Sequence, residues 1–362
     1  MKRLVHPGIE TLKPYPPGKP IEELERELGI KGPIKLASNE NPLGPSPKAL
    51  EVIKACLYGL NRYPDGSAYY LKDALANHFG IAPEQIVVGN GSNEIIELAI
   101  RTFLAPGELA IQPYPTFLVY EKMVKAQGGS MVSVPLENFR LDMEGIKAHI
   151  KDDVKLVFLN NPNNPTGTHI THHELVNFLE EIPEDLLVIL DEAYIEFAQD
   201  PNIAKGINLL ERFENLVVLR TFSKLYGLAG LRIGYGFLSR RLADYINRVR
   251  QPFNVNTLAQ KAATAALKDY AFVANTLKLV REEKAFLYRA LEELGLRYIP
   301  SQTNFFLIEV GDGEEVYKAM LKQGVIVRSM KAFGLESYIR ISVGLREENV
   351  RFLDALRRVL KV

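Results

Sequence analysis

Lys224 lies in the sequence Thr-Phe-Ser-Lys at residues 221–224, directly after an apolar run at residues 216–219, and Arg232 follows eight residues later. A lysine at the end of a predicted buried strand, with two hydroxyls and an arginine nearby, suits a Schiff base with an aldehyde cofactor that carries a phosphate. The hydroxyls and the guanidinium would bind the phosphate, and burial would favour the uncharged amine. Because most lysines are solvated surface residues, this interpretation depends on the rest of the site.

Three other polar segments follow predicted strands, at residues 89–94 (Gly-Asn-Gly-Ser-Asn-Glu), 160–167 (Asn-Asn-Pro-Asn-Asn-Pro-Thr-Gly) and 191–194 (Asp-Glu-Ala-Tyr). The first opens a predicted helix, whose free N–H groups can bind an anion, although glycine-rich turns of this kind are common. The second is a rigid pair of Asn-Pro units, which turn formation alone would also explain. Asp191 ends a buried strand, where a carboxylate needs a cation such as the ring nitrogen of a pyridoxal cofactor, unless it caps the next segment.

The elements that position these segments alternate along the chain. Short apolar runs separated by amphipathic helical patterns occur at residues 86–88, 109–111, 131–134, 154–159, 186–190 and 216–219. Continuous apolar strands alternating with helices predict an α/β fold, with a mainly parallel sheet covered by helices on both faces. Ligands of such sheets bind beyond the carboxyl ends of the strands, where all four polar segments lie.

The chain of 362 residues is long enough for one large and one smaller domain. Five prolines within the first 20 residues predict an extended arm, which we place in residues 1–30. Residues 31–250 form the predicted large domain. Residues 251–362 have a different pattern, with a long helical run at 258–296, three apolar runs and a closing helix from Glu347, and form a smaller α+β domain.

The composition argues against several classes of binding partner. Lys plus Arg and Asp plus Glu both number 44, so no charge excess predicts binding to nucleic acid or to a membrane. No apolar stretch approaches the roughly 18 residues that span a bilayer. Cys56 is the one cysteine and the six histidines are scattered, which favours a reducing cytoplasmic compartment and no metal site. A dinucleotide-binding enzyme is disfavoured because the glycine fingerprint is missing.

Taken together, the motifs at residues 161–167, 191–194 and 221–224, with the arginine at position 232, resemble those of the fold-type I pyridoxal-phosphate aminotransferases of class I/II. They occur in that family's order and spacing, and the resemblance runs from about residue 14 to the C-terminus. Within the class, the chain is most similar to the histidinol-phosphate aminotransferases, as further stretches indicate at residues 12–15, 37–42, 61–65, 252–256 and 338–344. The resemblance implies amino-group transfer between L-histidinol phosphate and 2-oxoglutarate in histidine biosynthesis.

The resemblance also implies a role for each site residue. Lys224 forms the Schiff base and moves the substrate's proton, while Asp191 pairs with the ring nitrogen of pyridoxal 5'-phosphate. The other cofactor contacts are Tyr194 and Asn164 to the ring oxygen, Phe117 stacked on the ring, and Ser92, Asn93, Thr221, Ser223 and Arg232 around the phosphate. Tyr63 would reach the neighbouring subunit's cofactor, which implies a homodimer. Phe117 and Thr221 stand where many relatives have Tyr and Ser.

Two arginines and a tyrosine are the predicted substrate-binding residues. Arg340 lies in an alternating strand and is implied to clamp the α-carboxylate. Arg328, with Tyr15 on the arm, would bind the substrate's phosphate or the side-chain carboxylate of glutamate, unless it only pairs with a surface acid. An aromatic amino-acid aminotransferase and a phosphothreonine-type decarboxylase remain alternatives. A non-catalytic pyridoxal-sensing regulator is disfavoured because it would need an added DNA-binding domain.

Overall fold

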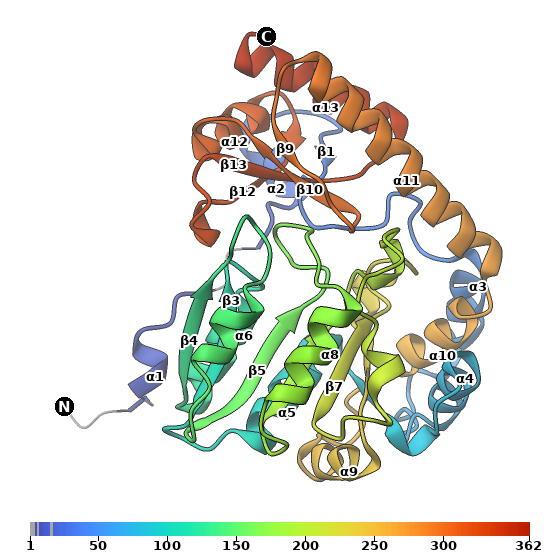
Figure 1. Cartoon of the computed structure of the whole chain (residues 1–362). Coiled ribbons are helices and arrows are strands. Elements are labelled where there is room, and N and C mark those ends of the chain that lie inside the picture. Colours follow the sequence, from blue (N-terminus) through green and yellow to red (C-terminus); the bar gives the residue numbers. More distant parts are fainter. Residues whose placement is uncertain (1–3, 6, 15–16) are drawn as a thin grey trace.

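The computed structural model describes residues 4–5, 7–14 and 17–362. Figure 1 shows a large sheet flanked by helices below a smaller sheet with its own helices. The long helix α11 (Tyr270–Glu293) runs from one part toward the other. Tyr15, which is predicted to contact substrate, lies outside the described residues.

The large sheet has seven strands in the order β2-β8-β7-β6-β5-β3-β4. Their bounds are β2 (Ile86–Gly89), β3 (Leu109–Tyr114), β4 (Ser130–Pro135), β5 (Val154–Asn160), β6 (Leu187–Asp191), β7 (Leu216–Thr221) and β8 (Gly234–Phe237). All neighbours from β4 to β7 pair in parallel, and β8 is antiparallel to both β2 and β7. The six predicted strands and the mainly parallel α/β fold are confirmed. Strand β8 was not predicted because its sequence, Gly-Tyr-Gly-Phe, contains no apolar run.

Both faces of the large sheet are buried, as continuous apolar strands require. Leu187 and Ile189 of β6 pack with α5 (Ser92–Phe103), α6 (Val119–Gln127) and α9 (Arg240–Val249). Val188 and Leu190 belong to the core on the other face, which is covered by α3 (Pro47–Cys56), α4 (Tyr69–Phe79), α7 (Met143–Ala148), α8 (His172–Glu181) and α10 (Thr257–Ala266). Because side chains alternate along a strand, the last residue of β6, Asp191, points to the α5–α6 side.

The smaller sheet is antiparallel, with the order β12-β13-β10-β9. Its strands are β9 (Tyr298–Ile299), β10 (Phe305–Glu309), β12 (Arg328–Ser329) and β13 (Tyr338–Ser342), and its helices are α12 (Gly313–Lys322) and α13 (Arg346–Leu360). The predicted helical run at residues 258–296 is divided into α10 and α11 by a break at residues 267–269. The domain boundaries after residues 30 and 250 stay predictions.

The N-terminal part of the chain is tied to the C-terminal part. Strand β1 (Ile34–Lys35) pairs in parallel with β11 (Val325–Ile326). Helix α2 (Ile21–Leu28) buries Leu24 against Ala37 and Ile326. Within the stretch expected to be extended, Pro7–Glu10 forms a short helix, α1, since proline is well tolerated at a helix start.

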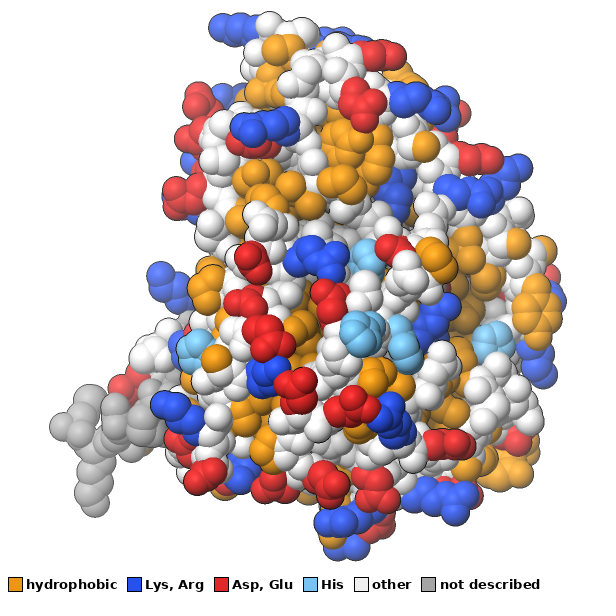
Figure 2. Space-filling view, viewed as in Figure 1, with side chains coloured by type: hydrophobic (Ala, Val, Ile, Leu, Met, Phe, Trp, Pro, Cys, Tyr) orange, Lys and Arg blue, Asp and Glu red, His pale blue; other side chains and the backbone are white. Residues whose placement is uncertain are grey.

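Charged side chains are interspersed on the face shown in Figure 2, where lysines and arginines lie among aspartates and glutamates. This mixture agrees with the equal totals of 44 in the sequence. Among the described residues, no helix has both the length and the apolar character to cross a bilayer.

Candidate active site

A cavity of about 260 Å³ lies at the carboxyl ends of β5, β6 and β7 and the N-terminus of α5. This is the edge at which a parallel sheet binds its ligands. The structure brings to this cavity all the predicted cofactor residues except Tyr63, namely Ser92, Asn93, Phe117, Asn164, Asp191, Tyr194, Thr221, Ser223, Lys224 and Arg232. Segments that are separated by more than 100 residues in the sequence therefore line one small space.

Lys224 follows β7 and its side chain lies in this cavity. Its Nζ donates a hydrogen bond to the carbonyl oxygen of Ser38, at 3.1 Å, and lies 5.6 Å from the centre of the Tyr194 ring. Burial lowers the pKa of Lys224 to about 8, and the positive charges of Arg340 and Arg232 act in the same direction. A fraction of the amine is thus uncharged near neutral pH, which a nucleophile or base requires.

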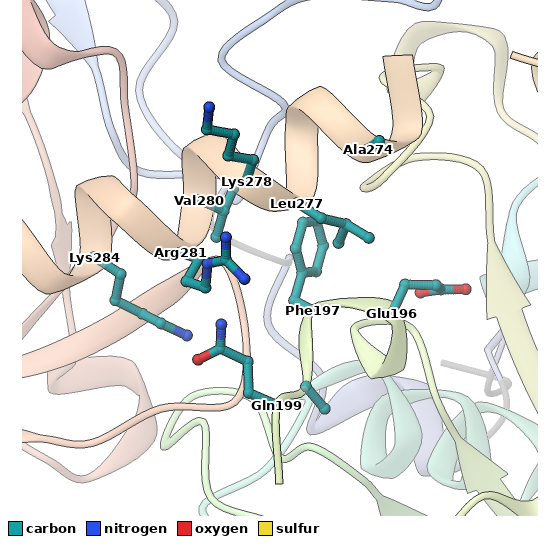
Figure 3. A pocket seen from close by; sticks show the side chains of 10 residues that line it. Glu196, Phe197, Gln199, Ala274, Leu277, Lys278, Val280, Arg281 and Lys284 are labelled. Atoms are coloured by element: carbon teal, nitrogen blue, oxygen red, sulfur yellow. The ribbon is translucent and has the colours of Figure 1, made fainter. Parts of the chain in front are cut away.

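A second buried lysine shows that a lowered pKa does not by itself identify a reactive amine. Burial also lowers the pKa of Lys284 on α11 to about 8. Lys284 borders a cavity of about 340 Å³ between α11 and the turn Ile195–Phe197, where Figure 3 shows its side chain on the same side as Arg281 and Gln199. Its Nζ donates to the carbonyl oxygens of Ser301 and Thr303, at 2.7 and 2.9 Å. Lys284 therefore holds a loop in place, and its cavity contains none of the predicted site residues.

One end of the Lys224 cavity is built to take an anion. Ser92 and Asn93 are the first residues of α5, where N–H groups and the helix dipole favour negative charge. Gly91, with φ of 81°, lets Arg232 approach, because a Cβ at this position would lie 2.3 Å from Arg232 Nη2. Thr221 Oγ1 accepts a hydrogen bond from the Ser223 N–H at 3.0 Å. Hydroxyls, N–H groups and a guanidinium of this kind suit a phosphate.

Asp191 lies at another side of the cavity, at the end of β6. Its side chain is only 3% exposed. Burial raises the pKa of Asp191 to about 6, and hydrogen bonds from Tyr120 and from the Ala193 N–H oppose this shift. The Tyr120 hydroxyl donates to Asp191 Oδ2 at 2.6 Å, and the Ala193 N–H donates to Oδ1 at 3.1 Å. Sequence reasoning missed Tyr120, which in a helical pattern resembles any other core residue.

Arg340 reaches the cavity residues from the smaller sheet. Its Nη1 donates to Asn164 Oδ1 at 2.5 Å and its Nη2 donates to the carbonyl oxygen of Ala37 at 3.0 Å. Tyr194 accepts a hydrogen bond from Asn39 Nδ2 at 3.0 Å. Asn39 lies in the supporting stretch at residues 37–42, and nothing in that stretch indicated that its side chain reaches the site.

Asn160 is a further residue that sequence reasoning did not single out. It lines the cavity, and its Oδ1 accepts a hydrogen bond from the Asn164 N–H at 2.8 Å. Its Nδ2 donates to the carbonyl oxygen of Asp191 at 2.9 Å. The side chain therefore ties the turn after β5 to the end of β6. Its position at the head of the Asn-Pro motif was the available signal.

Arg328 and Tyr63 are not among the residues that line the cavity. Arg328 is on β12, directly opposite Arg340 in the antiparallel pair. Tyr63 is 83% exposed and stacks on Phe253, with ring centres 4.8 Å apart. It borders a separate hollow of about 720 Å³, so a single chain does not bring Tyr63 to Lys224.

Comparisons with known proteins place this site in a family. The sequence model of "Aminotransferase class I and II" matches residues 31–356. The chain belongs to the class I and II aminotransferases. This aminotransferase is 48% identical over 361 residues to histidinol-phosphate aminotransferase 2 of Carboxydothermus hydrogenoformans, covering 99% of this chain and 100% of the relative. It is 47% identical over 360 residues to the histidinol-phosphate aminotransferase of an Anaeromyxobacter species, covering 99% of both chains.

Solved structures agree with the fold of this aminotransferase. The crystal structure of histidinol-phosphate aminotransferase from Sinorhizobium meliloti, in complex with pyridoxal-5'-phosphate, superposes with a TM-score of 0.91 at 30% identity. The superposition covers 99% of this chain and 98% of the other. The predicted fold-type I architecture is confirmed.

Proposed function

We propose that this aminotransferase transfers the amino group of L-histidinol phosphate to 2-oxoglutarate with pyridoxal 5'-phosphate as cofactor. The observation that carries the proposal is the meeting, in one cavity, of a buried lysine, a buried carboxylate and an anion-binding helix N-terminus. The full-length similarity to proteins named for this reaction supports the same substrate.

The residues of the cavity fit the cofactor. Gly91 leaves room for Arg232 beside the start of α5, which forms a cradle for the phosphate. Asp191 would hold the ring nitrogen in its protonated form, and Tyr194 and Asn164 would bind the ring oxygen. Phe117, whose ring makes a T-shaped contact with Tyr120, would cover the ring. Bound pyridoxal phosphate supplies an aldehyde that bonds to amines and a ring that takes up the electrons of the substrate's Cα–H bond.

The protein's own part in the reaction is to bind, orient and move one proton. Lys224 Nζ takes the proton from the substrate's Cα, which it can do because burial leaves part of the amine uncharged. The carbonyl oxygen of Ser38 keeps this amine inside the cavity. Asn164, fixed by Asn160, connects the cofactor side of the site to Arg340.

Two arginines are available for the anionic ends of the substrates. Histidinol phosphate has a phosphate ester where an amino acid has its α-carboxylate, whereas glutamate has two carboxylates. Arg340, 6% exposed and held by Asn164 and Ala37, would bind the group next to the reacting carbon. Arg328, opposite it in the sheet, would add charge for the phosphate or for the second carboxylate.

A substrate panel tests this function. The enzyme loaded with cofactor is given histidinol phosphate, phenylalanine, tyrosine or phosphothreonine, with 2-oxoglutarate as acceptor, and both glutamate and carbon dioxide are measured. We expect the highest kcat/KM for histidinol phosphate and no carbon dioxide. Higher kcat/KM with the aromatic amino acids, or carbon dioxide release from phosphothreonine, would replace the proposal by one of the two alternatives.

We further propose a homodimer in which Tyr63 completes the neighbouring site, since its exposed ring lies outside the cavity of its own chain. Mixing two inactive variants tests this. In a mixed dimer of Lys224→Ala and Tyr63→Phe chains, one site has Lys224 from one chain and Tyr63 from the other, so part of the activity should return. No recovery after subunit exchange would exclude a shared site.

The reducing cytoplasm is the compartment we propose, because the one cysteine, Cys56, is free.

A further inference from the structure

Tyr120 is a buried tyrosine of α6 that has no assigned role in the proposed reaction. Its side chain is fully buried, and its ring stacks on Phe158 of β5, with centres 4.7 Å apart and planes 11° apart. The same ring makes a T-shaped contact with Phe117, the residue proposed to cover the cofactor, with ring centres 5.5 Å apart. Two aromatic neighbours therefore fix the direction of the phenol.

The phenol points at Asp191. Its hydroxyl donates to Asp191 Oδ2 at 2.6 Å, a length typical of a hydrogen bond to a charged oxygen. Burial, with the neighbouring Asp191 charge, raises the pKa of Tyr120 well above its ordinary value, so the phenol keeps its proton and stays a donor near neutral pH. The Ala193 N–H occupies Oδ1, and a carboxylate still has room for one more donor.

Glu192 is the nearest acid along the chain; its charge adds to the rise in the pKa of Asp191, and its side chain pairs with Arg220 on the other face of the sheet. Its Oε2 accepts hydrogen bonds from Nε and Nη2 of Arg220 on β7, at 3.0 and 2.8 Å. Its Oε1 accepts the N–H of Gly206 at 2.6 Å. Tyr120 is therefore the side chain whose hydrogen bond most directly stabilises a negative charge on Asp191.

We propose that Tyr120 is a positioning residue that keeps Asp191 ionised and correctly oriented, so that the proton shared with the cofactor stays on the ring nitrogen. The inference rests on the proposed function, because it assigns Asp191 to that nitrogen. A buried carboxylate without such a donor would compete for the proton, since burial disfavours its charged form. The ring would then lose the positive charge that makes it an electron acceptor.

The test uses Tyr120→Phe and, as a matched control, Tyr235→Phe. Tyr235 is equally buried, and its hydroxyl meets no hydrogen-bond partner among the described residues. Wild type and both variants are loaded with pyridoxal phosphate labelled with nitrogen-15 in the ring, and the nitrogen chemical shift is measured. In Tyr120→Phe it should move toward the value of unprotonated pyridine, and kcat should fall about tenfold or more with little change in KM. Tyr235→Phe should match wild type in both.

A second measurement does not need the cofactor. In the apoprotein, the carboxyl carbon of Asp191 is titrated by NMR, with Asp191→Asn used to assign its signal. Removing the phenol should raise the pKa of Asp191 above the wild-type value of about 6. Fluorotyrosine at position 120, a stronger donor in the same ring, should lower it, which keeps the test available if Tyr120→Phe folds poorly.

The results separate the two proposals. A wild-type protein that binds no cofactor would remove the proposed function, and this inference with it. A wild type that binds cofactor and transaminates histidinol phosphate, together with a Tyr120→Phe variant that matches Tyr235→Phe in nitrogen shift and in Asp191 titration, would overturn the role of Tyr120 alone.

Discussion

Arg328 and Arg340 are directly opposite each other in the antiparallel pair of β12 and β13. Directly opposite residues of neighbouring strands project from the same face, and like charges in that arrangement repel. An anion with more than one negative charge that lies beside both guanidinium groups would be attracted by each of them. Phosphate esters and dicarboxylates are such anions, so under the proposed function we expect these two arginines to favour its two substrates over an amino acid with a neutral side chain.

We therefore expect Arg328→Gln to discriminate between donors. In half-reactions without 2-oxoglutarate, kcat/KM for histidinol phosphate should fall about tenfold to a hundredfold, the range of a lost charge-assisted hydrogen bond. The value for phenylalanine should change much less. Arg297→Gln is the control, because Arg297 belongs to the same sheet region and pairs with Glu309 at the surface. Equal losses for both donors would favour the aromatic aminotransferase instead.

The two buried lysines should respond differently to mutation. Lys224→Ala should lose turnover and also the visible absorption band that the cofactor gives when it is bonded to the lysine. Lys284→Met should keep the band, since Lys284 Nζ bonds to the carbonyl oxygens of Ser301 and Thr303 outside the Lys224 cavity. It should unfold at a lower temperature, because two buried carbonyls lose their donor. Absorption spectra and thermal unfolding of the loaded proteins check both. A normal band in Lys224→Ala would remove the assignment of this residue.

Gly91→Ala should weaken cofactor binding through Arg232. The new Cβ would lie 2.3 Å from Arg232 Nη2, so the end of the arginine has to move away from the phosphate cradle. We expect the Kd for pyridoxal phosphate to rise about tenfold or more. Gly107→Ala is the matched control, because Gly107 also has positive φ, of 94°, but a Cβ there meets nothing within 4 Å. Both variants should lose about 1 kcal/mol of stability, and only Gly91→Ala should lose affinity.

Asp191 should make the apoprotein less stable as the pH rises. Burial raises the pKa of its carboxyl from 3.8 to about 6, so the folded protein holds a proton that the unfolded chain has lost. The contribution to stability is complete below the unfolded pKa and is lost as the pH rises through about 6. Relative to Asp191→Asn, the free energy of unfolding of wild type should thus fall by roughly 3 kcal/mol over that range. Urea titrations of both apoproteins measure the difference, and parallel curves would contradict it.

The sequence predicted the parts of the fold whose signals are local. Buried parallel strands are continuous apolar runs, and the motifs that follow them lie at one edge of the sheet for topological reasons, so the cavity around Lys224 and Asp191 could be expected. Strand β8 was missed because glycines fill alternate positions where it passes the helix start at Ser92. Tyr120 and Asn39 were missed because their partners, Asp191 and Tyr194, are 71 and 155 residues away. Nothing in a single helix or turn encodes such pairings.

Strand β1 has a consequence for how the protein is made. Ile34 pairs with Val325, and the Asn39 N–H donates to Ser342 Oγ, 303 residues further along the chain. The segment between them carries Ser38, whose carbonyl oxygen holds the Lys224 amine. During synthesis, the large sheet can form before this segment has its partners, because they lie about 300 residues further along the chain and leave the ribosome later. An enzyme truncated before β13 should therefore keep the large sheet and Lys224. It would lack the contact with Ser342 that fixes the segment whose Ser38 carbonyl oxygen holds the amine in place.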